Sequence, residues 1–509
     1  MTLVRLIVLI AVCSIGISFP AGMLQAFSFN GPAGNISVDR TRADDPELDA
    51  LSNALAHYVM GGIYDNYGKT RSAIAEYEEA LSYRDDVADI YIKMGADFLL
   101  LGELTNAGER LNKAIEIDPG NIRSYLLLAV VHTAKGEYRE AQIQHEKVLE
   151  QNPDDLRTLG FLSDLFVLRK QYDKAADIYE RMLKIDQNNA FLYFNLGIIY
   201  SKADQLGKAE ESLKKAIELD KSYVEAQMVL GFVYEVEGNL RDAIKQYRNV
   251  VEINPAHKEA HARLGHVYFR QGEMDEAIGE IRELIRLDPH SPESHLKLFS
   301  IYVIRNRYDD AKAVLEEALA QGVSEAVIYA SLGYVSILDK DYKQAIEYYK
   351  IAVRKEPKDI LYRFYLGVAT NRSGNKKKAI HILEGCVSGD IDFPEIYNYL
   401  GYLYVEEGKN LDRAVKLIRK ALELDPENGA YLDSLGWAYY KKGMMAEALE
   451  YMKRAVEGLP NDSTVRDHLG DVYFSMGNTE KAGQEWRKAF GLDPGNAMIR
   501  EKLEDLKKR

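Results

Sequence analysis

A 34-residue pattern recurs thirteen times along residues 54–496, and this periodicity restricts the possible folds more than any other feature of the chain. Position 20 of the pattern is alanine in every copy, and position 8 is glycine in ten of the thirteen. Proline occupies position 32 in eight copies, and a single inserted residue near 409–410 interrupts the register. A unit this short cannot bury an apolar face alone, so neighbouring units have to stack into one continuous core.

Each unit has the pattern of two helices joined by a short turn. Apolar residues at positions 4, 7, 8 and 11 recur at helical spacing, and small residues at positions 8 and 20 allow two helices to cross closely. Proline near the end of the unit stops the second helix. One copy shows the whole pattern, with Leu432, Leu435, Gly436, Tyr439, Ala448, Met452, Ala455 and Pro460.

These residues and their period resemble the tetratricopeptide repeat (TPR) family. The resemblance implies an all-α superhelical solenoid of about thirteen helix-turn-helix repeats over residues 54–496. Residues 497–509 have apolar side chains at helical spacing with charges between them, which predicts a capping helix over the last repeat. Asp45, Pro46 and Glu47 predict the start of a helix, over residues 46–53, that leads into the first repeat.

The N-terminus has the pattern of a secretory signal peptide. Arg5 precedes an apolar run over residues 6–19, and a more polar stretch ends at Ala26. We therefore expect residues 1–26 to be cleaved and residues 27–45 to form a flexible linker. A retained anchor is the alternative, but the run is shorter than the roughly 18–20 residues that span a bilayer. Lipid attachment at Cys13 is a weaker alternative, because Val12 is too large for that motif.

Charge and motif searches argue against nucleic-acid binding and catalysis. The formal net charge is −14, whereas phosphate binding requires a concentrated basic stripe. His257, His261 and His266 lie close together, but no third ligand or nearby cysteine completes a zinc site. Cys386 occupies a position where alanine is common, which predicts a small buried side chain. We expect no enzyme activity, no cofactor and no metal ion.

The candidate binding site is one face of the first helices. Positions 2, 5, 9 and 12 share a face that is rotated away from the core face, and the TPR resemblance implies that it lines a concave groove. Aromatic and apolar residues lie along it, joined near the C-terminus by three acids and an asparagine, which would suit a partner segment with apolar and basic residues. The candidate groove residues are Phe191, Phe194, Met228, Phe232, Phe269, Tyr334, Phe364, Asn398, Tyr402, Asp433, Trp437, Tyr440, Asp467, Asp471 and Phe474. Alternatively, adjacent first helices pack these side chains against each other.

Residues 395–442 resemble a block found in exported bacterial TPR adaptors, one of which is an outer-membrane lipoprotein that binds and activates a carboxyl-terminal processing protease. This resemblance implies a non-catalytic protein-binding scaffold or adaptor of the bacterial cell envelope, periplasmic or associated with the outer membrane. Its expected partners are protein or peptide segments. The alternatives are a TPR component of an exopolysaccharide or pilus secretion machine and, from a different class, a hydrolase or metal enzyme.

Overall fold

The computed structural model describes residues 46–387 and 392–508, and over these residues its secondary structure is helical, without strands. The predicted all-α TPR solenoid is confirmed. The expected signal peptide at residues 1–26 and linker at residues 27–45 lie outside the described residues. The first described helix begins at Pro46. No helix within the described ranges has both the length and the apolar character that crossing a membrane requires.

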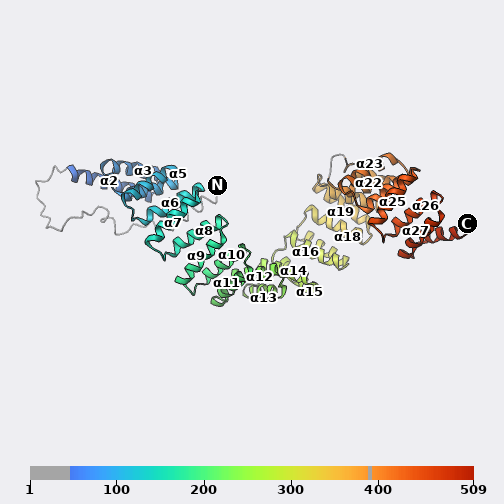
Figure 1. Ribbon diagram of the computed structural model, residues 1–509, viewed down its shortest axis with the longest axis horizontal. Coiled ribbons are helices and arrows are strands. Elements are labelled where there is room, and N and C mark those ends of the chain that lie inside the picture. The colour runs from blue at the N-terminus through green and yellow to red at the C-terminus, as the bar shows by residue number, and fades with distance from the viewer. Residues whose placement is uncertain (1–45, 388–391, 509) are drawn as a thin grey trace. The chain divides into compact units, whose positions relative to one another are not determined.

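Thirteen helix pairs and one further helix follow each other along the described chain (Figure 1). After the first pair, each first helix begins at position 1 of a repeat, as the periodicity predicts. The first helices are α2 (Pro46–Asn66), α4 (Ala88–Leu100), α6 (Ile122–Lys135), α8 (Leu156–Leu168), α10 (Ala190–Lys202), α12 (Val224–Glu237), α14 (Lys258–Gln271), α16 (Pro292–Ile304), α18 (Ala326–Leu338), α20 (Ile360–Arg372), α22 (Pro394–Glu407), α24 (Gly429–Lys441) and α26 (Ser463–Ser475).

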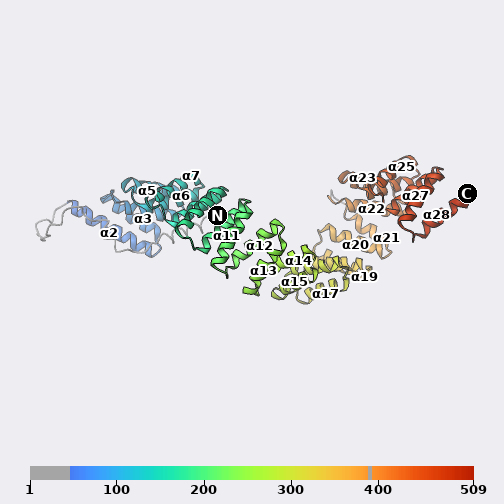
Figure 2. The ribbon, with the colours of Figure 1, turned by 60° about the horizontal axis from the view of Figure 1, so that its bottom comes forward.

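The second helices of the pairs are α3 (Thr70–Tyr83), α5 (Leu104–Ile117), α7 (Tyr138–Gln151), α9 (Tyr172–Ile185), α11 (Leu206–Leu219), α13 (Leu240–Ile253), α15 (Met274–Leu287), α17 (Tyr308–Ala320), α19 (Tyr342–Lys355), α21 (Lys376–Glu384), α23 (Leu411–Leu424), α25 (Met445–Gly458) and α27 (Thr479–Leu492). The helices form two compact units, Met1–Ala260 and His261–Arg509. Within the first unit, the hairpins lie side by side in chain order (Figure 2).

The small residues at positions 8 and 20 allow the two helices of each pair to pack closely. All the position-20 alanines among the core residues have no exposed surface, as Ala73, Ala243 and Ala448 illustrate. A Cβ added at Gly231 would lie 2.5 Å from a ring carbon of Tyr247 on the second helix. This contact explains why this copy of the repeat has glycine at position 8.

The predicted capping helix is α28 (Ala497–Lys508), and it covers the last pair of helices. Ile499 is buried in a cluster with Trp486, and Leu503 and Leu506 pack against that cluster. Glu501 and Glu504 lie on the exposed side of the helix. One side of α28 therefore completes the core of the last repeat while the other faces solvent.

Candidate protein-binding surface

The most open part of the candidate groove lies on α10 and α12 in the first unit. Phe191 is 60% exposed and Phe232 is 43% exposed, while Phe194 is half-buried against Tyr223, with ring centroids 4.9 Å apart. Met228 on α12 is also half-buried. We call Phe191, Phe194, Tyr223, Met228 and Phe232 the α10–α12 row.

Local capping and helical periodicity give the row its orientation. The Asn189 side chain accepts hydrogen bonds from the backbone N–H groups of Phe191 and Leu192, which fixes the start of α10. From that start, Leu192 and Leu196 point into the core, and Phe191 lies on a different face. The same sequence that packs the hairpin therefore leaves an aromatic face outside its core.

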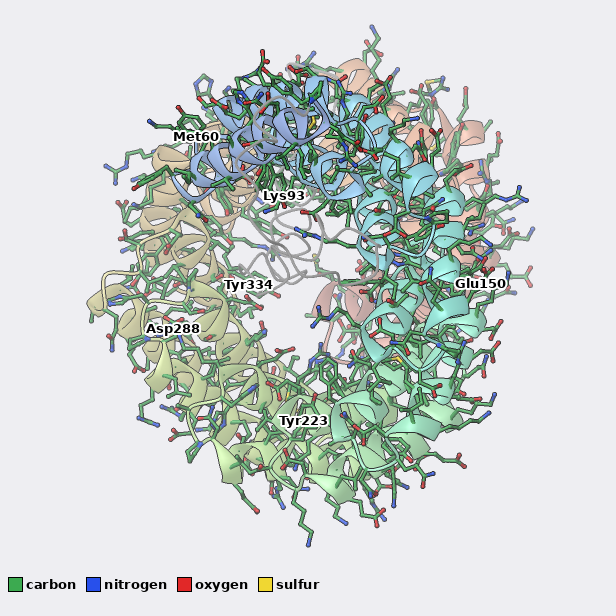
Figure 3. The ribbon with its side chains drawn as sticks, turned by 90° about the vertical axis from the view of Figure 1, so that its left-hand side faces the viewer. Met60, Lys93, Glu150, Tyr223, Asp288 and Tyr334 are labelled. Carbon is green, nitrogen blue, oxygen red and sulfur yellow. The ribbon has the colours of Figure 1, made fainter. Side chains whose placement is uncertain are left out.

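One member of the row, Tyr223, lies on the inner side of the curve that the first unit follows. Viewed along the helix row, Lys93 and Tyr223 lie on the inner side of this unit and Glu150 lies on its outer side (Figure 3). Tyr223 is the residue at the N-terminal end of α12 and contacts Phe194 of the row. Phe194 therefore lies next to a residue on the inner side of the first unit.

In the second unit, the more N-terminal groove residues remain accessible. Tyr334 on α18 is 40% exposed and lies on the inner side of that unit's helices (Figure 3). Phe269, Asn398 and Tyr402 are each half-buried. Phe364 is different, because it is buried and its ring meets those of Phe393 and Tyr399 at centroid distances of 5.6 and 5.7 Å. Phe364 is a packing residue, and its assignment to an open groove is wrong.

Trp437 is also a packing residue, contrary to the sequence prediction. It is only 8% exposed, and its rings stack with those of Tyr440 and His468 at centroid distances of 4.6 and 4.0 Å. The ammonium of Lys441 lies 4.8 Å from the centroid of a Trp437 ring. Here the alternative interpretation holds, since neighbouring first helices pack these side chains against each other.

The acids near the C-terminus are paired within the protein. Buried Asp433 lies 3.0 Å from Nδ1 of His468. The ammonium of Lys502 on α28 lies 2.8 Å from Asp467 and 2.6 Å from Asp471. Phe474 packs against Trp486 in the same region. These carboxylates are occupied by the molecule's own cations, so the prediction that they would attract a basic partner segment is wrong.

The pKa shifts in this cluster reflect competition between burial and ion pairing. Burial alone would lower the pKa of His468, but the carboxylate of Asp433, with smaller contributions from Asp467 and Asp471, offsets burial, and the pKa is raised. Burial raises the pKa of Asp471 despite Lys502, whereas the two carboxylates raise the pKa of Lys502 against the effect of burial. The raised pKa of Asp471 favours a neutral acid, whereas the raised pKa of Lys502 favours a charged ammonium that pairs with a carboxylate. The distances from the Lys502 ammonium to Asp467 and Asp471 are those of charge-assisted hydrogen bonds, so we assign a charged lysine shared between the two carboxylates.

A second buried polar cluster, in the first unit, was missed by the sequence reasoning. Asp97 on α4 is 5% exposed, and burial together with the charge of Asp65 raises its pKa to about 8. The Tyr77 hydroxyl donates a hydrogen bond to Asp65 at 2.6 Å. A signal was present, because Asp97 occupies position 10 of its repeat, which is apolar in every other copy. The cluster lies between α2, α3 and α4 and has a structural role.

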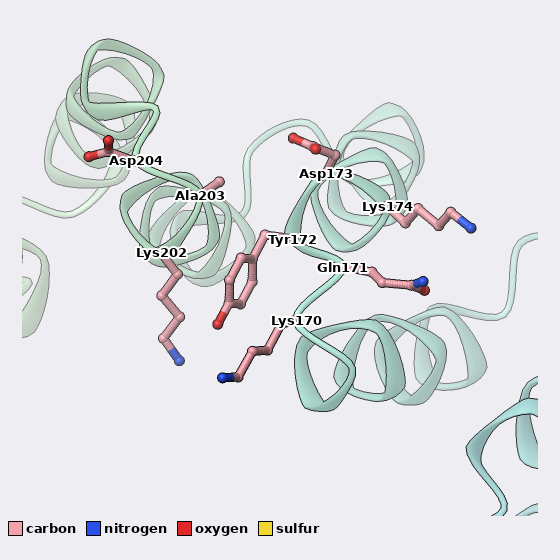
Figure 4. Close-up of a pocket in the computed structure, with 8 residues that line it drawn as sticks. All are labelled: Lys170, Gln171, Tyr172, Asp173, Lys174, Lys202, Ala203 and Asp204. Atoms are coloured by element: carbon pink, nitrogen blue, oxygen red, sulfur yellow. The ribbon is translucent and has the colours of Figure 1, made fainter.

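No arrangement typical of catalysis appears among residues 46–387 and 392–508. No three His, Cys, Asp or Glu side chains there lie close enough to hold a metal ion. Cys386 is buried, and burial raises the pKa of its thiol to about 11. An open pocket of about 450 Å³ lies at the turns before α9 and after α10, where Lys170, Tyr172 and Lys202 are neighbours (Figure 4). Its lining combines lysines with Asp173 and Asp204 and contains no pairing of a nucleophile with a base.

Models of the tetratricopeptide repeat match residues 98–165, 178–211, 233–292, 296–360, 339–384, 400–463 and 464–496. These matches cover more than half of the chain, and the chain belongs to the TPR family. TPR solenoids are typically non-catalytic scaffolds that bind proteins or peptides, and this chain is a protein-binding scaffold in that general sense.

Individual known proteins resemble the chain less closely. A TPR repeat-containing protein of Pseudomonas aeruginosa is 26% identical over 99 residues, which are 19% of this chain and 17% of that protein. The chain thus spans less than a fifth of the length of that relative. Among solved structures, the APC/C hetero-tetramer Cut9-Hcn1 is 16% identical with a TM-score of 0.42 and covers 91% of this chain and 98% of its own. Yeast Tom70 is 17% identical with a TM-score of 0.36, covering 90% of this chain and 95% of its own.

Proposed function

We propose that this protein is a non-catalytic adaptor or scaffold of the bacterial cell envelope that holds an apolar segment of a partner protein on the α10–α12 row. The observation that carries the proposal is the open aromatic surface of Phe191 and Phe232, which are 60% and 43% exposed. Phe194 and Met228, on the same two helices, are partly buried. Exposed aromatic side chains on neighbouring helices are typical of protein–protein contact sites.

The chemistry of the row favours an extended or helical segment with bulky apolar side chains. Aromatic residues contribute large contact areas with few rotatable bonds, and they dominate the binding energy of many interfaces. The acids of α24 and α26 are paired with His468 and Lys502, so we assign no basic specificity to the site. The proposed envelope location rests on the signal-peptide pattern of residues 1–26.

The proposal can be tested by affinity capture from bacterial envelope extracts with the full chain as bait. Phe191→Ala combined with Phe232→Ala should reduce capture of the natural partner at least about tenfold, because truncating a central interface aromatic often costs about 2 kcal/mol or more of binding free energy. Hydrogen exchange of α10–α13 should remain unchanged, since both side chains lie outside the hairpin core.

Ile143→Ala is the matched control. Ile143 is 44% exposed but lies on α7, a second helix, away from the face formed by the first helices. This variant should capture the partner as well as the unsubstituted chain does. Equal capture by the double variant would show that the α10–α12 row is not the site.

A further inference from the structure

The first described helix, α2, has an apolar face that nothing in the described chain covers. Its exposed large apolar side chains recur at helical spacing, and they span about 28 Å of helix length at 1.5 Å per residue. Five lie on α2 and the sixth follows directly after it: Leu48, Leu55, Val59, Met60, Ile63 and Tyr67. We call this set the α2 stripe. It is the largest group of exposed apolar side chains on any single helix of the first unit.

The same positions are core positions in the later repeats. Met60 and Ile63 occupy positions 7 and 10, and they are 41% and 42% exposed. In the twelve later first helices, position 10 is always buried and position 7 is buried in all but Leu366, which is half-buried. Apart from α14, which spans the boundary between the two units, each of those helices follows the second helix of a preceding repeat and packs against it. The α2 stripe therefore has the composition of a surface that another helix covers.

The charges at the two ends of α2 indicate which helix covers the α2 stripe. Exposed Glu47 and Asp49 lie in its first turn, while exposed Lys69 follows its C-terminal end. Arg71, two residues further on, is already paired with Glu103, so Lys69 is the basic group considered at this end. If two copies of α2 align antiparallel, the acidic end of each lies beside the basic end of the other, and the helix dipoles are also opposed. Exposed Ala56, near the middle of the stripe, allows close approach of the two helices.

We propose that the α2 stripe pairs with the α2 stripe of a second copy of this chain in an antiparallel, two-fold symmetric homodimer. A two-fold interface requires a surface that is complementary to itself. The stripe meets this condition, because its apolar middle matches an apolar middle and its charged ends match when reversed. This inference is independent of the proposed role of the α10–α12 row.

Sedimentation equilibrium of the full chain provides the first test. We expect a reversible dimer of the 57.7 kDa chain. Met60→Glu combined with Ile63→Glu should raise the dissociation constant at least about tenfold. Ile143→Glu changes a side chain of similar exposure on α7 and should leave the dimer intact. A monomer at all concentrations up to about 100 μM would overturn the proposal, because a dimer of micromolar affinity is largely formed there. An equal loss of dimer with Ile143→Glu would also overturn it.

The orientation can be tested by cross-linking with a short bis-maleimide. Ala56 lies near the middle of the stripe, so Ala56→Cys should cross-link to itself across the two-fold axis. Leu48→Cys should not, because antiparallel pairing places the two Leu48 positions at opposite ends. The unsubstituted chain, with its own cysteines, sets the background. Efficient cross-linking of Leu48→Cys would contradict the antiparallel arrangement.

A charge exchange separates self-association from other occupants of the stripe. Lys69→Glu should weaken the dimer, and adding Glu47→Lys and Asp49→Lys should restore it, since the two ends then exchange charge. Failure of the second change to restore the dimer would contradict the proposed pairing. If the chain were monomeric and Met60→Glu with Ile63→Glu only abolished binding to a different protein or to anionic vesicles, the stripe would serve that partner and the homodimer would be excluded.

Discussion

At position 8 of several first helices, glycine leaves room for a large side chain of the second helix, and an added methyl group would overlap with it. A Cβ at Gly231 would lie 2.5 Å from Cε1 of Tyr247, and one at Gly470 would lie 2.4 Å from Cδ1 of Trp486. Tyr247 is fully buried and its hydroxyl donates a hydrogen bond to Glu235, so the ring cannot move aside without losing that contact. The sequence periodicity therefore reflects a packing requirement that is local to each hairpin.

Gly231→Ala should destabilise the protein by about 1–3 kcal/mol, because the added methyl group overpacks the contact with Tyr247. Gly207→Ala is the control. Gly207 lies in α11 with no atom within 4 Å of an added Cβ, so alanine should stabilise that helix by up to about 1 kcal/mol. Chemical denaturation of both variants checks the prediction. Similar effects of the two substitutions would show that the contact at position 8 does not control packing.

Trp437→Ala should cost about 3–5 kcal/mol, comparable to Trp486→Ala, because both rings are buried. Phe232 occupies the same position 9 on α12 but is 43% exposed, so Phe232→Ala should cost much less. Denaturation midpoints of the three variants measure the difference. A small effect at Trp437 would restore it as an accessible binding residue.

The contrast between Trp437 and Phe232 shows which site properties the sequence could predict. Both occupy position 9, and helical spacing correctly places that position outside the hairpin core. Their different exposure depends on the next first helix, where His468 stacks on Trp437 at 4.0 Å. Those two residues are 31 positions apart, and the repeat pattern does not specify side chains at position 6. The pairing of Asp467 and Asp471 with Lys502 depends on α28 in the same way.

At the scale of helices, two clusters of ionisable side chains lie where neighbouring helices pack against each other. Asp97 on α4 is buried beside Asp65 of α2, and Asp467 and Asp471 of α26 share Lys502 of α28. In the cluster of Asp467 and Asp471, Lys502 neutralises part of the negative charge. The cluster of Asp65 and Asp97 instead brings two carboxyl groups together. The two ends of the described chain should therefore respond differently to pH.

Asp97 should make the first repeats less stable as the pH rises. Burial and Asp65 raise its pKa from an ordinary carboxyl value of 3.8 to about 8, so the folded state binds this proton more tightly than the unfolded state does. The stabilisation is complete below the unfolded value and is lost as the pH rises towards 8. Each unit of pKa shift corresponds to about 1.4 kcal/mol, and the loss is on the order of several kcal/mol.

Asp97→Asn should remove most of this dependence and increase stability at pH 9, because the amide mimics the protonated acid. Hydrogen exchange of α2–α5, corrected for intrinsic rates, measures the local opening free energy at pH 5 and pH 9. Glu79→Gln alters an exposed carboxylate on α3 and should leave the pH profile unchanged. An unaltered profile for Asp97→Asn would assign the pH response to other groups.

For the molecule as a whole, periodicity predicted the fold to the level of individual helices. The 34-residue register places the starts of the later first helices, from α4 at Ala88 to α26 at Ser463. It succeeds because every repeat solves the same packing problem with its nearest neighbours. The boundary between the units at Ala260 and His261 has no comparable signal, since the repeat pattern continues through it without interruption.

Nearest-neighbour packing also predicts how damage spreads. Gly231→Ala should increase hydrogen exchange in α12 and α13 and in the adjacent pairs, while α2–α5 retain their protection. The physical reason is that the helices of one repeat contact mainly the helices directly before and after them. Exchange mass spectrometry resolves the effect helix by helix. A uniform loss of protection along residues 46–260 would mean that the first unit unfolds as one cooperative block.

The N-terminus determines where this binding surface operates in the cell. The apolar run at residues 6–19, preceded by Arg5 and followed by a polar stretch ending at Ala26, predicts export with cleavage. Protein isolated from the envelope fraction should begin at Phe27 and carry no lipid on Cys13, because Val12 does not suit lipid attachment. Intact-mass and N-terminal peptide analysis distinguish the outcomes. An N-terminus that begins at Met1 would indicate a retained anchor, and a diacylglyceryl group on Cys13 would indicate a lipoprotein. Either result would place the α10–α12 row and the α2 stripe at a membrane surface.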